Sequence, residues 1–152
     1  MSVKVKIYLD KGAQMPTRKH DDDYCWDLTA ISRLDDTAID KPHKGAITYD
    51  TGVHIAPEPS FKGCGNGFAR SSVCFTGLVL SNGKGIIDRN YRGSIKAVFY
   101  VATEDGDRYN VGDRILQFAL STGEEIEWVR VNSLEELGET DRGDGGYGSS
   151  GR

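Results

Sequence analysis

The sequence predicts an all-β domain with the architecture of a β-sandwich, a jelly roll or a small barrel. Apolar residues recur mostly at every second position, and this spacing places them on one face of a strand. The segments with this pattern are short, and turn signals such as Asn82-Gly83, Asp105-Gly106 and Thr122-Gly123 separate them. Many short strands at such spacing are typical of these three architectures.

The first predicted strand, Val3–Leu9, has the clearest alternation. Its apolar residues Val3, Val5 and Ile7 are interleaved with lysines, so one face of the strand is expected in the core. The same reasoning gives the other strands. The further predicted strands are Cys25–Ile31, Ala46–Ile55, Gly77–Leu80, Ile95–Val101, Arg114–Leu120 and Ile126–Val131.

Three local features complete the expected elements. Asn82–Gly93 is predicted to form a tight hairpin followed by a polar turn. Only Ser133–Leu137 has a helical pattern, with Ser133 as N-cap and Glu136 three residues later, as in a capping box. His54 alternates with apolar neighbours and is expected on the surface of its strand.

Length and composition exclude several classes of protein. The 152 residues favour one domain that buries roughly 68–70% of its unfolded surface. A net charge of −4 and a pI of about 5.4 argue against binding to nucleic acid or an anionic membrane. The three cysteines form no CxxC pair and the three histidines no HxxxH pair, so neither a zinc site nor a disulfide framework is indicated. Because Met1–Asp10 contains no signal-peptide core or membrane span, we expect a cytoplasmic protein.

The composition changes after residue 137. The segment 138–152 contains six glycines, no aliphatic side chain and Tyr147 as its only aromatic residue. Such a segment buries too little apolar area to offset its ordering entropy, so alone it should be disordered. We therefore divide the chain into a β-barrel domain, 1–137, and a flexible arm, 138–152. Ten extended residues span about 33 Å, against a domain radius of gyration of roughly 15 Å, so the arm can reach a neighbouring subunit.

The arm has the residue types that bind phosphate. Its glycines let backbone N–H groups converge on an anion, Ser149 and Ser150 add hydroxyl donors, and Arg142 and Arg152 add positive charge. Tyr147 suits stacking on a flat ring, a contact worth about 1–3 kcal/mol for a nucleobase. A solubilising tail is the alternative interpretation of the same glycine content.

Four other signals lie in the β region, and each is weak alone. They are Asp27 in Trp26-Asp27-Leu28, the triplet Arg70-Ser71-Ser72, the hairpin Asn82–Gly93 and the turn Gly112–Gln117. An acid inside a strand suits water molecules around a hard cation, and hydroxyl and guanidinium donors suit phosphate. Turn, cap or edge positions explain the same residues without any ligand.

The order of these signals closely resembles that of the trimeric deoxyuridine triphosphatase (dUTPase) family. The chain has Asp-Leu, then RSS, then N-x-x-G-x-I-D-x-x-Y-R-G, then GDRI-x-Q, and finally RG-x-GG-aromatic-GS, from about residue 15 to 151. The resemblance implies a jelly-roll-like, distorted β-barrel and a homotrimer with arm exchange and three active sites between subunits. It also implies Mg²⁺-assisted hydrolysis of dUTP to dUMP and pyrophosphate, which limits uracil in DNA and supplies dUMP for dTMP synthesis.

The resemblance also implies roles for single residues. Asp88 would activate the water that attacks the α-phosphorus, a role that suits a carboxylate. Asp27 would hold Mg²⁺ through water molecules. Phosphate oxygens would be bound from the barrel and from another subunit's arm by Arg70, Ser71, Ser72, Gln117, Arg142, Gly146, Ser149 and Ser150.

Selectivity for the base and sugar follows from the hairpin and two tyrosines. The backbone of 83–87, including Gly85 and Ile87, would pair with uracil with help from the Asn82 amide and would mismatch cytosine. Tyr91 would exclude a 2′-OH beneath the sugar, and Tyr147 would lie over the uracil.

Three other functions stay open on the sequence. A deoxycytidine triphosphate deaminase has a similar fold but needs a glutamate where this chain has Val98, and an enzyme acting on both dUTP and dCTP would need a less selective hairpin. A non-catalytic trimer that decorates a surface or senses nucleotides is the alternative from a different class. The departures from the family pattern at Tyr24-Cys25-Trp26 and at the glycine-rich stretch 60–69 leave room for a partner surface.

Overall fold

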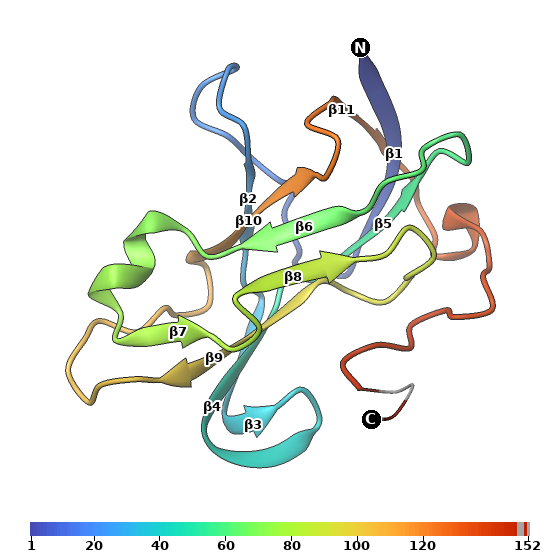
Figure 1. The fold of residues 1–152 in the computed structure, drawn as a ribbon. Coiled ribbons are helices and arrows are strands. Elements are labelled where there is room, and N and C mark those ends of the chain that lie inside the picture. Colours follow the sequence, from blue (N-terminus) through green and yellow to red (C-terminus); the bar gives the residue numbers. More distant parts are fainter. Residues whose placement is uncertain (149–150, 152) are drawn as a thin grey trace.

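A computed structural model describes residues 1–148 and 151, and it confirms the all-β expectation (Figure 1). The described residues form strands joined by loops of varied length, with 3-10 turns in place of longer helices. The strands are β1 (Ser2–Leu9), β2 (Trp26–Thr29), β3 (Ser32–Ala38), β4 (Lys41–Asp50), β5 (Val53–Pro57), β6 (Gly65–Phe68), β7 (Leu78–Leu80), β8 (Lys84–Ile87), β9 (Lys96–Val101), β10 (Arg114–Leu120) and β11 (Glu125–Arg130). The 3-10 turns are η1 (Ser71–Phe75) and η2 (Glu135–Leu137).

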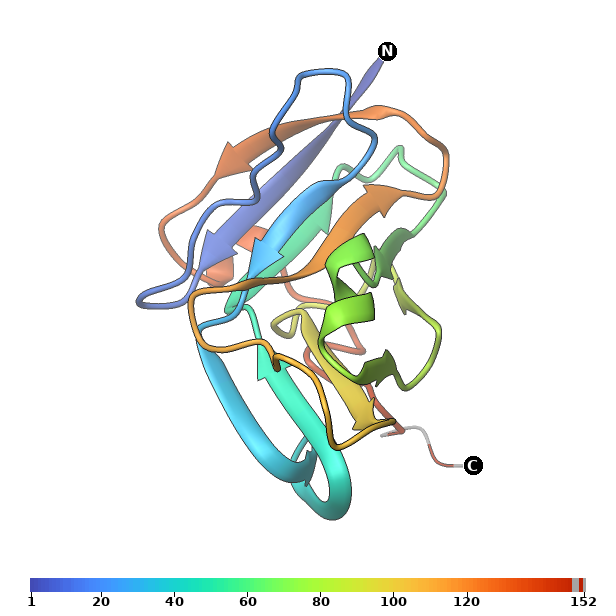
Figure 2. The same ribbon diagram turned by 90° about the vertical axis from the view of Figure 1, so that its left-hand side faces the viewer.

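In the part of the chain that the structure describes, the strands form three sheets. Their orders are β11-β1-β5, β2-β10-β6-β8 and β3-β4-β9-β7. Only β1 and β11 pair in parallel, and the other pairs between these strands are antiparallel. The β3–β4 hairpin projects from one end of the barrel, and η1 lies beside β10 and leads into β7 (Figures 1 and 2).

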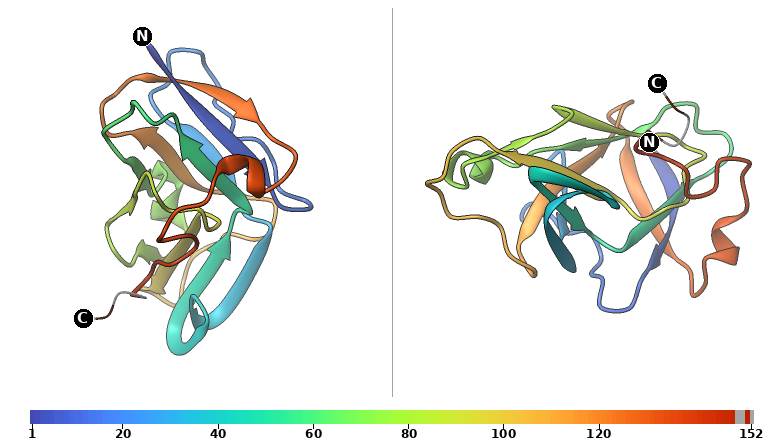
Figure 3. Two further views of the ribbon diagram at one scale, coloured as in Figure 1. Left: turned by 90° about the vertical axis from the view of Figure 1, so that its right-hand side faces the viewer. Right: turned by 90° about the horizontal axis from the view of Figure 1, so that it is seen from below.

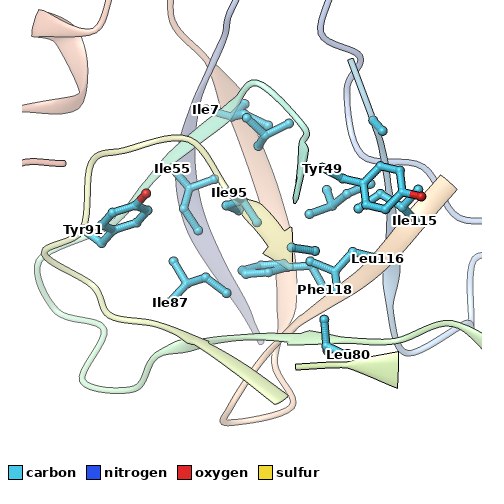
Figure 4. Packing of buried hydrophobic residues seen from close by; sticks show 14 of the residues in the cluster. Ile7, Tyr49, Ile55, Leu80, Ile87, Tyr91, Ile95, Ile115, Leu116 and Phe118 are labelled. Carbon is cyan, nitrogen blue, oxygen red and sulfur yellow. The ribbon is translucent and has the colours of Figure 1, made fainter. Parts of the chain in front are cut away.

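The core lies between the sheets and follows the predicted alternation. Val3, Val5 and Ile7 are at most 4% exposed, whereas the lysines between them face solvent. Aromatic and aliphatic side chains from all three sheets meet inside the barrel, including Tyr49, Ile55, Ile95, Ile115 and Phe118 (Figure 4). Burial of this apolar surface is the main stabilising contribution to the fold.

The two tryptophans of the sequence pack against each other at the edge of this core. Trp26 of β2 and Trp128 of β11 meet edge to face, with ring centroids 5.7 Å apart. The guanidinium of Arg18 lies 4.3 Å from the centre of the Trp26 ring, a cation–π contact. These residues join the sheet of β2 to the sheet of β11.

The single strand predicted for Ala46–Ile55 is wrong. The structure divides it into β4 and β5 at Thr51-Gly52. Gly52 has φ +65°, and a Cβ there would lie 2.6 Å from Cδ1 of Ile31, so glycine lets the chain turn sharply against a packed side chain. The surface position expected for His54 is also wrong, because this residue is 8% exposed and its ring nitrogens face the Arg92 carbonyl and Asp10.

Two strands lie where none was predicted. β3 has an exposed polar centre and β6 is built from Gly65, Asn66 and Gly67, so neither shows a hydrophobic alternation. At β6 the glycines allow a close approach, since a Cβ on Gly65 would lie 2.4 Å from the ring of Phe118.

The helical prediction at residues 133–137 needs a correction as well. Only Glu135–Leu137 forms a 3-10 turn, and its N-cap is Leu134, not Ser133. One half of the expected capping box is present, because a Glu136 carboxylate oxygen accepts a hydrogen bond from the Ser133 N–H at 2.9 Å.

A second 3-10 turn, η1, contains Ser71 and Ser72 of the RSS triplet. Among the described residues, no helix has the length and apolar composition required to cross a membrane.

The contact between Gly65 and Phe118 makes a first prediction. Gly65→Ala should lower the free energy of unfolding by about 1–3 kcal/mol, because the new methyl group overlaps a fully buried ring. Gly85→Ala in the neighbouring strand is the matched control, since its Cβ would meet its nearest atom at 3.7 Å. Urea denaturation measures both variants, and equal stabilities would contradict the packing argument.

Candidate active site

The tight hairpin predicted at Asn82–Gly93 is wrong, because the Asn82-Gly83 turn joins β7 and β8, which belong to different sheets and do not pair with each other. A cavity lies where this turn and β8 face the arm. Its volume is about 170 Å³, and its lining includes Asn82, Gly85, Ile87, Tyr91 and Tyr147. β8 is the outer strand of its sheet, so one side of its backbone lacks a strand partner and can offer N–H and C=O groups to a ligand. The structure therefore brings together the five residues that the sequence assigns to base and sugar.

Tyr91 forms a rigid wall of this cavity. Its side chain lies on the same side of the core as Ile87 (Figure 4), and the residue is 5% exposed. The hydroxyl donates a hydrogen bond to the Ser94 carbonyl at 2.8 Å, and burial raises the pKa of the Tyr91 hydroxyl. The ring is thus neutral and fixed, as a group that excludes substrates by shape must be.

Asp88 follows β8 directly, at the end of this strand away from the Asn82-Gly83 turn. Its carboxylate is half exposed and forms an ion pair with Arg142 of the arm. Arg142 is itself oriented, because its Nε donates to the Gly145 carbonyl at 2.7 Å and its guanidinium lies 5.5 Å from the centre of the Tyr91 ring. The arm's first arginine therefore covers the carboxylate in this arrangement.

Hydrogen bonds fasten the described part of the arm to its own barrel. The Tyr147 hydroxyl accepts a hydrogen bond from the Lys96 N–H at 3.0 Å and donates one to the Lys96 carbonyl at 2.8 Å. Partial desolvation raises the pKa of the Tyr147 hydroxyl, although the residue as a whole is 46% exposed. Closer to its start, the arm contacts Arg92, whose Nε donates to the Gly138 carbonyl at 3.1 Å. Figure 3 shows the arm leaving η2 beside β1 and β5.

The close approach of the arm to Tyr91 explains why residue 146 is a glycine. A Cβ there would lie 3.2 Å from Cε1 of Tyr91, closer than side chains ordinarily approach. Gly146 thus lets the arm backbone lie directly against the tyrosine wall. Ser149 and Ser150, which the sequence assigns to phosphate binding, lie outside the described residues.

A second group of predicted residues surrounds Asp27 in β2. One carboxylate oxygen of Asp27 pairs with Nε of Arg70 at 2.9 Å, and the other pairs with Nη1 of Arg114 at 3.2 Å. Arg70 also donates to the Ser72 hydroxyl at 3.1 Å. Two guanidinium groups against one carboxylate leave this cluster net positive, which favours an anion such as phosphate.

Gln117 and Ser71 complete this second group. Gln117 lies directly opposite Asp27 in the β2–β10 pairing, and its amide donates to the Ala69 carbonyl at 2.9 Å. Ser71 lines the same hollow as Asp27 and Gln117. All the barrel residues predicted to bind phosphate therefore lie together.

The residues that line the cavity beside β8 and the residues around Asp27 lie in separate hollows of one chain. Asp27 pairs with Gln117, Gln117 with Phe68, and Phe68 with Lys84, so three strand spacings separate Asp27 from the start of β8. Three spacings amount to about 14 Å. Asp88 lies a further four residues along β8, which adds about 13 Å along the strand. Asp27 and Asp88 of one chain are therefore well separated across the sheet.

The fit of a magnesium ion follows from the donors at Asp27. The described residues contain no cluster of three or more His, Cys, Asp or Glu side chains that could enclose a metal. Mg²⁺ commonly retains several waters and binds through one carboxylate together with substrate phosphates. Asp27 would supply the carboxylate, and the guanidinium groups beside it would bind the phosphates that hold the ion. The residues present therefore fit a magnesium ion that is held mainly by a triphosphate.

Sequence reasoning missed three residues of the site. Arg114 forms an ion pair with Asp27. The backbone N–H and carbonyl of Lys96 both form hydrogen bonds with the Tyr147 hydroxyl. The Tyr109 hydroxyl contacts the Ser72 hydroxyl. Arg114 lies inside the Gly112–Gln117 signal and could have been singled out as a phosphate ligand. Lys96 acts through its backbone and Tyr109 through a tertiary contact, and neither has a sequence signal.

Comparisons with known proteins identify one family. A family model described as dUTPase matches residues 11–151. The deoxyuridine 5'-triphosphate nucleotidohydrolase of Mycobacterium leprae is 36% identical over 149 residues, which cover 95% of this chain and 92% of that protein. Among solved structures, a Staphylococcus bacteriophage 80alpha dUTPase with the nucleotide dUPNHPP aligns with a TM-score of 0.60 at 22% identity, over 97% of this chain and 98% of that chain. A phage phi11 dUTPase, described with a structural Mg(II) ion, aligns with a TM-score of 0.57 at 19% identity, over 76% and 88%.

The double hydrogen bond of Tyr147 makes a second prediction. Tyr147→Phe removes both bonds to Lys96, so the arm should detach more often and trypsin should cleave after Arg142 about fivefold to tenfold faster. Tyr100→Phe, at an exposed tyrosine in β9 outside the cavity, is the control. A cleavage rate equal to that of the unmodified protein would show that the hydroxyl does not hold the arm.

Proposed function

The chain belongs to the dUTPase family, and from that premise we propose that it hydrolyses dUTP to dUMP and pyrophosphate. The observation that carries the proposal is the cavity beside β8, in which an unpaired strand edge, a buried tyrosine and a glycine-lined arm converge next to the Asp88 carboxylate. That combination offers a recognition edge for a base and a proton acceptor for a water molecule. The reaction expected from the sequence and the geometry of this cavity agree.

In this proposal Asp88 accepts a proton from the water that attacks the α-phosphorus. A carboxylate paired with Arg142 is not free to do so, and a triphosphate competes for the same guanidinium with more negative charge. Binding of the nucleotide would thus draw Arg142 onto the phosphates and release Asp88 for catalysis. The two events are coupled because one side chain serves both.

Selection of the base and sugar rests on fixed groups. The free edge of β8 from Gly85 to Ile87 and the Asn82 amide would pair with uracil, and a base with the opposite donor order would leave buried polar groups unpaired. The rigid ring of Tyr91 would exclude a 2′-OH. Tyr147, already beside Tyr91 at a centroid distance of 6.4 Å, would cover the base.

We further propose a homotrimer in which one active site uses more than one chain. The separation of Asp27 from Asp88 across the sheet supports this arrangement, in which a second chain would supply the phosphate ligands Arg70, Ser71, Ser72 and Gln117. Exchange of the arm between chains, with Gly146, Ser149 and Ser150 on the phosphates, belongs to the same proposal. The described arm lies on its own barrel, and its length permits either placement.

Mg²⁺ enters the proposal as a companion of the triphosphate. When bound, it would neutralise charge on the phosphate oxygens as pyrophosphate leaves. Asp27, with oxygens fixed by Arg70 and Arg114, would contact the waters of the ion. The cytoplasmic location expected from the sequence stays a prediction.

The alternative reactions receive no support from the site. Val98 lines the cavity where a deaminase would need a glutamate, and an aliphatic side chain transfers no proton. Nothing in the cavity favours a purely structural or regulatory trimer over an enzyme.

Asp88→Asn tests the catalytic role directly. The variant should lose at least about a hundredfold in pyrophosphate release, because the amide cannot accept the proton of the water. Its affinity for the non-hydrolysable analogue α,β-imido-dUTP, measured by calorimetry, should remain within about threefold of the original. Asp40→Asn, at an exposed hairpin position, is the matched control. Full hydrolysis by the Asp88 variant would remove this residue from the chemistry.

Mixed trimers test the sharing of sites between chains. Asp88→Asn and Arg70→Gln chains should each be nearly inactive, but co-refolding at equal amounts should restore about one quarter of the original activity, since random assembly pairs intact groups in that share of sites. A mixture as inactive as its components would place both groups in a site made by one chain.

A further inference from the structure

The Ser72 hydroxyl is held between two side chains that come from distant parts of the sequence. Nη1 of Arg70 lies 3.1 Å from Oγ of Ser72, and the Tyr109 hydroxyl lies 2.8 Å from the same oxygen. Tyr109 belongs to the connection between β9 and β10 and is 6% exposed. Ser72 and Tyr109 line a hollow that also contains Arg70 and Arg114, the guanidinium groups of the positive cluster.

Tyr109 is fixed in place from both ends. Its backbone carbonyl accepts hydrogen bonds from the Tyr49 hydroxyl at 2.8 Å and from Nη1 of Arg33 at 3.0 Å. Its ring packs edge to face against Tyr49 and Phe99, at centroid distances of 6.2 and 6.1 Å. Tyr49 and Phe99 are fully buried, so the barrel core sets the position of the Tyr109 hydroxyl.

The protons and lone pairs available at Ser72 set the direction of the hydrogen bond between the Tyr109 and Ser72 hydroxyls. A serine hydroxyl has one proton and two lone pairs, and a guanidinium can only donate, so Arg70 uses one lone pair of Ser72. The Tyr109 hydroxyl has no other hydrogen-bond partner within residues 1–148 and 151. A buried hydroxyl proton is seldom left without an acceptor, so Tyr109 donates to the second lone pair. The proton of Ser72 is then free to point into the hollow.

We propose that Tyr109 is a positioning residue that aims the Ser72 proton, together with the Arg70 guanidinium, at the phosphate groups of the nucleotide. Without the Tyr109 donor, the Ser72 hydroxyl can rotate and its proton need not face the anion. Asp27 fixes Arg70 through Nε, and the Tyr109–Ser72 pair fixes it through Nη1, so the guanidinium is held at both of these nitrogens. The assignment of a phosphate ligand to this hollow rests on the proposed function.

Tyr109→Phe tests this assignment, with inorganic pyrophosphate as the probe. Calorimetry should show pyrophosphate binding weakened about fivefold, because one hydrogen bond to a phosphate oxygen loses its orientation. The KM for dUTP should rise by a similar factor while kcat changes less than about twofold, since this bond is made before and after the chemical step. Tyr8→Phe, at a tyrosine in β1 that lines neither hollow around Arg70, is the control and should keep both values.

A double-mutant cycle separates positioning from a loss of stability. If Tyr109 acts through Ser72, Tyr109→Phe should add no further loss to Ser72→Ala. Unchanged pyrophosphate affinity in Tyr109→Phe, or losses that add in the double variant, would overturn the proposal. An unmodified protein that leaves dUTP intact would overturn the proposed reaction instead, and the pyrophosphate measurements would still test Tyr109.

Discussion

The double pairing of β10 is the constraint on which the rest of the structure depends. β10 lies between β2 and β6, and its alternate residues bury Phe118 and Leu120 while Gln117 faces the Asp27 cluster. Moving the strand by one residue would exchange these faces, placing an amide in the core and an aromatic ring at the phosphate cluster. Because β6 carries β8 on its other edge, the same register also fixes how far the base-binding edge lies from Asp27.

The arm is attached by a different kind of force. Its described contacts are hydrogen bonds, the ion pair between Arg142 and Asp88, and the approach of Arg142, Gly146 and Tyr147 to the ring of Tyr91. Bonds of this kind exchange readily with water, so their net contribution is small and the arm can release without unfolding the barrel. The barrel is therefore stabilised mainly by apolar packing, whereas the described part of the arm is held mainly by polar contacts.

The sequence was most informative where one face of a strand is buried. β1 was predicted to within one residue because its alternation reflects burial directly, whereas β6 was missed because its glycines are selected by the space beside Phe118. Within the site, Asp88 and Tyr91 were singled out through the resemblance of the motif order to the dUTPase family. The pairing of Arg142 with Asp88 and of Tyr109 with Ser72 joins residues 54 and 37 positions apart, and only the tertiary fold brings such groups together.

The contact between Trp26 and Trp128 determines what intrinsic fluorescence can report. Both indoles lie at the junction of β2 and β11, so their emission follows the integrity of the barrel, while the aromatic residue of the arm is a tyrosine. Excitation at the red edge of the absorption band, where only indole absorbs, would observe denaturation without interference from the arm. Indole emission therefore reports the barrel alone.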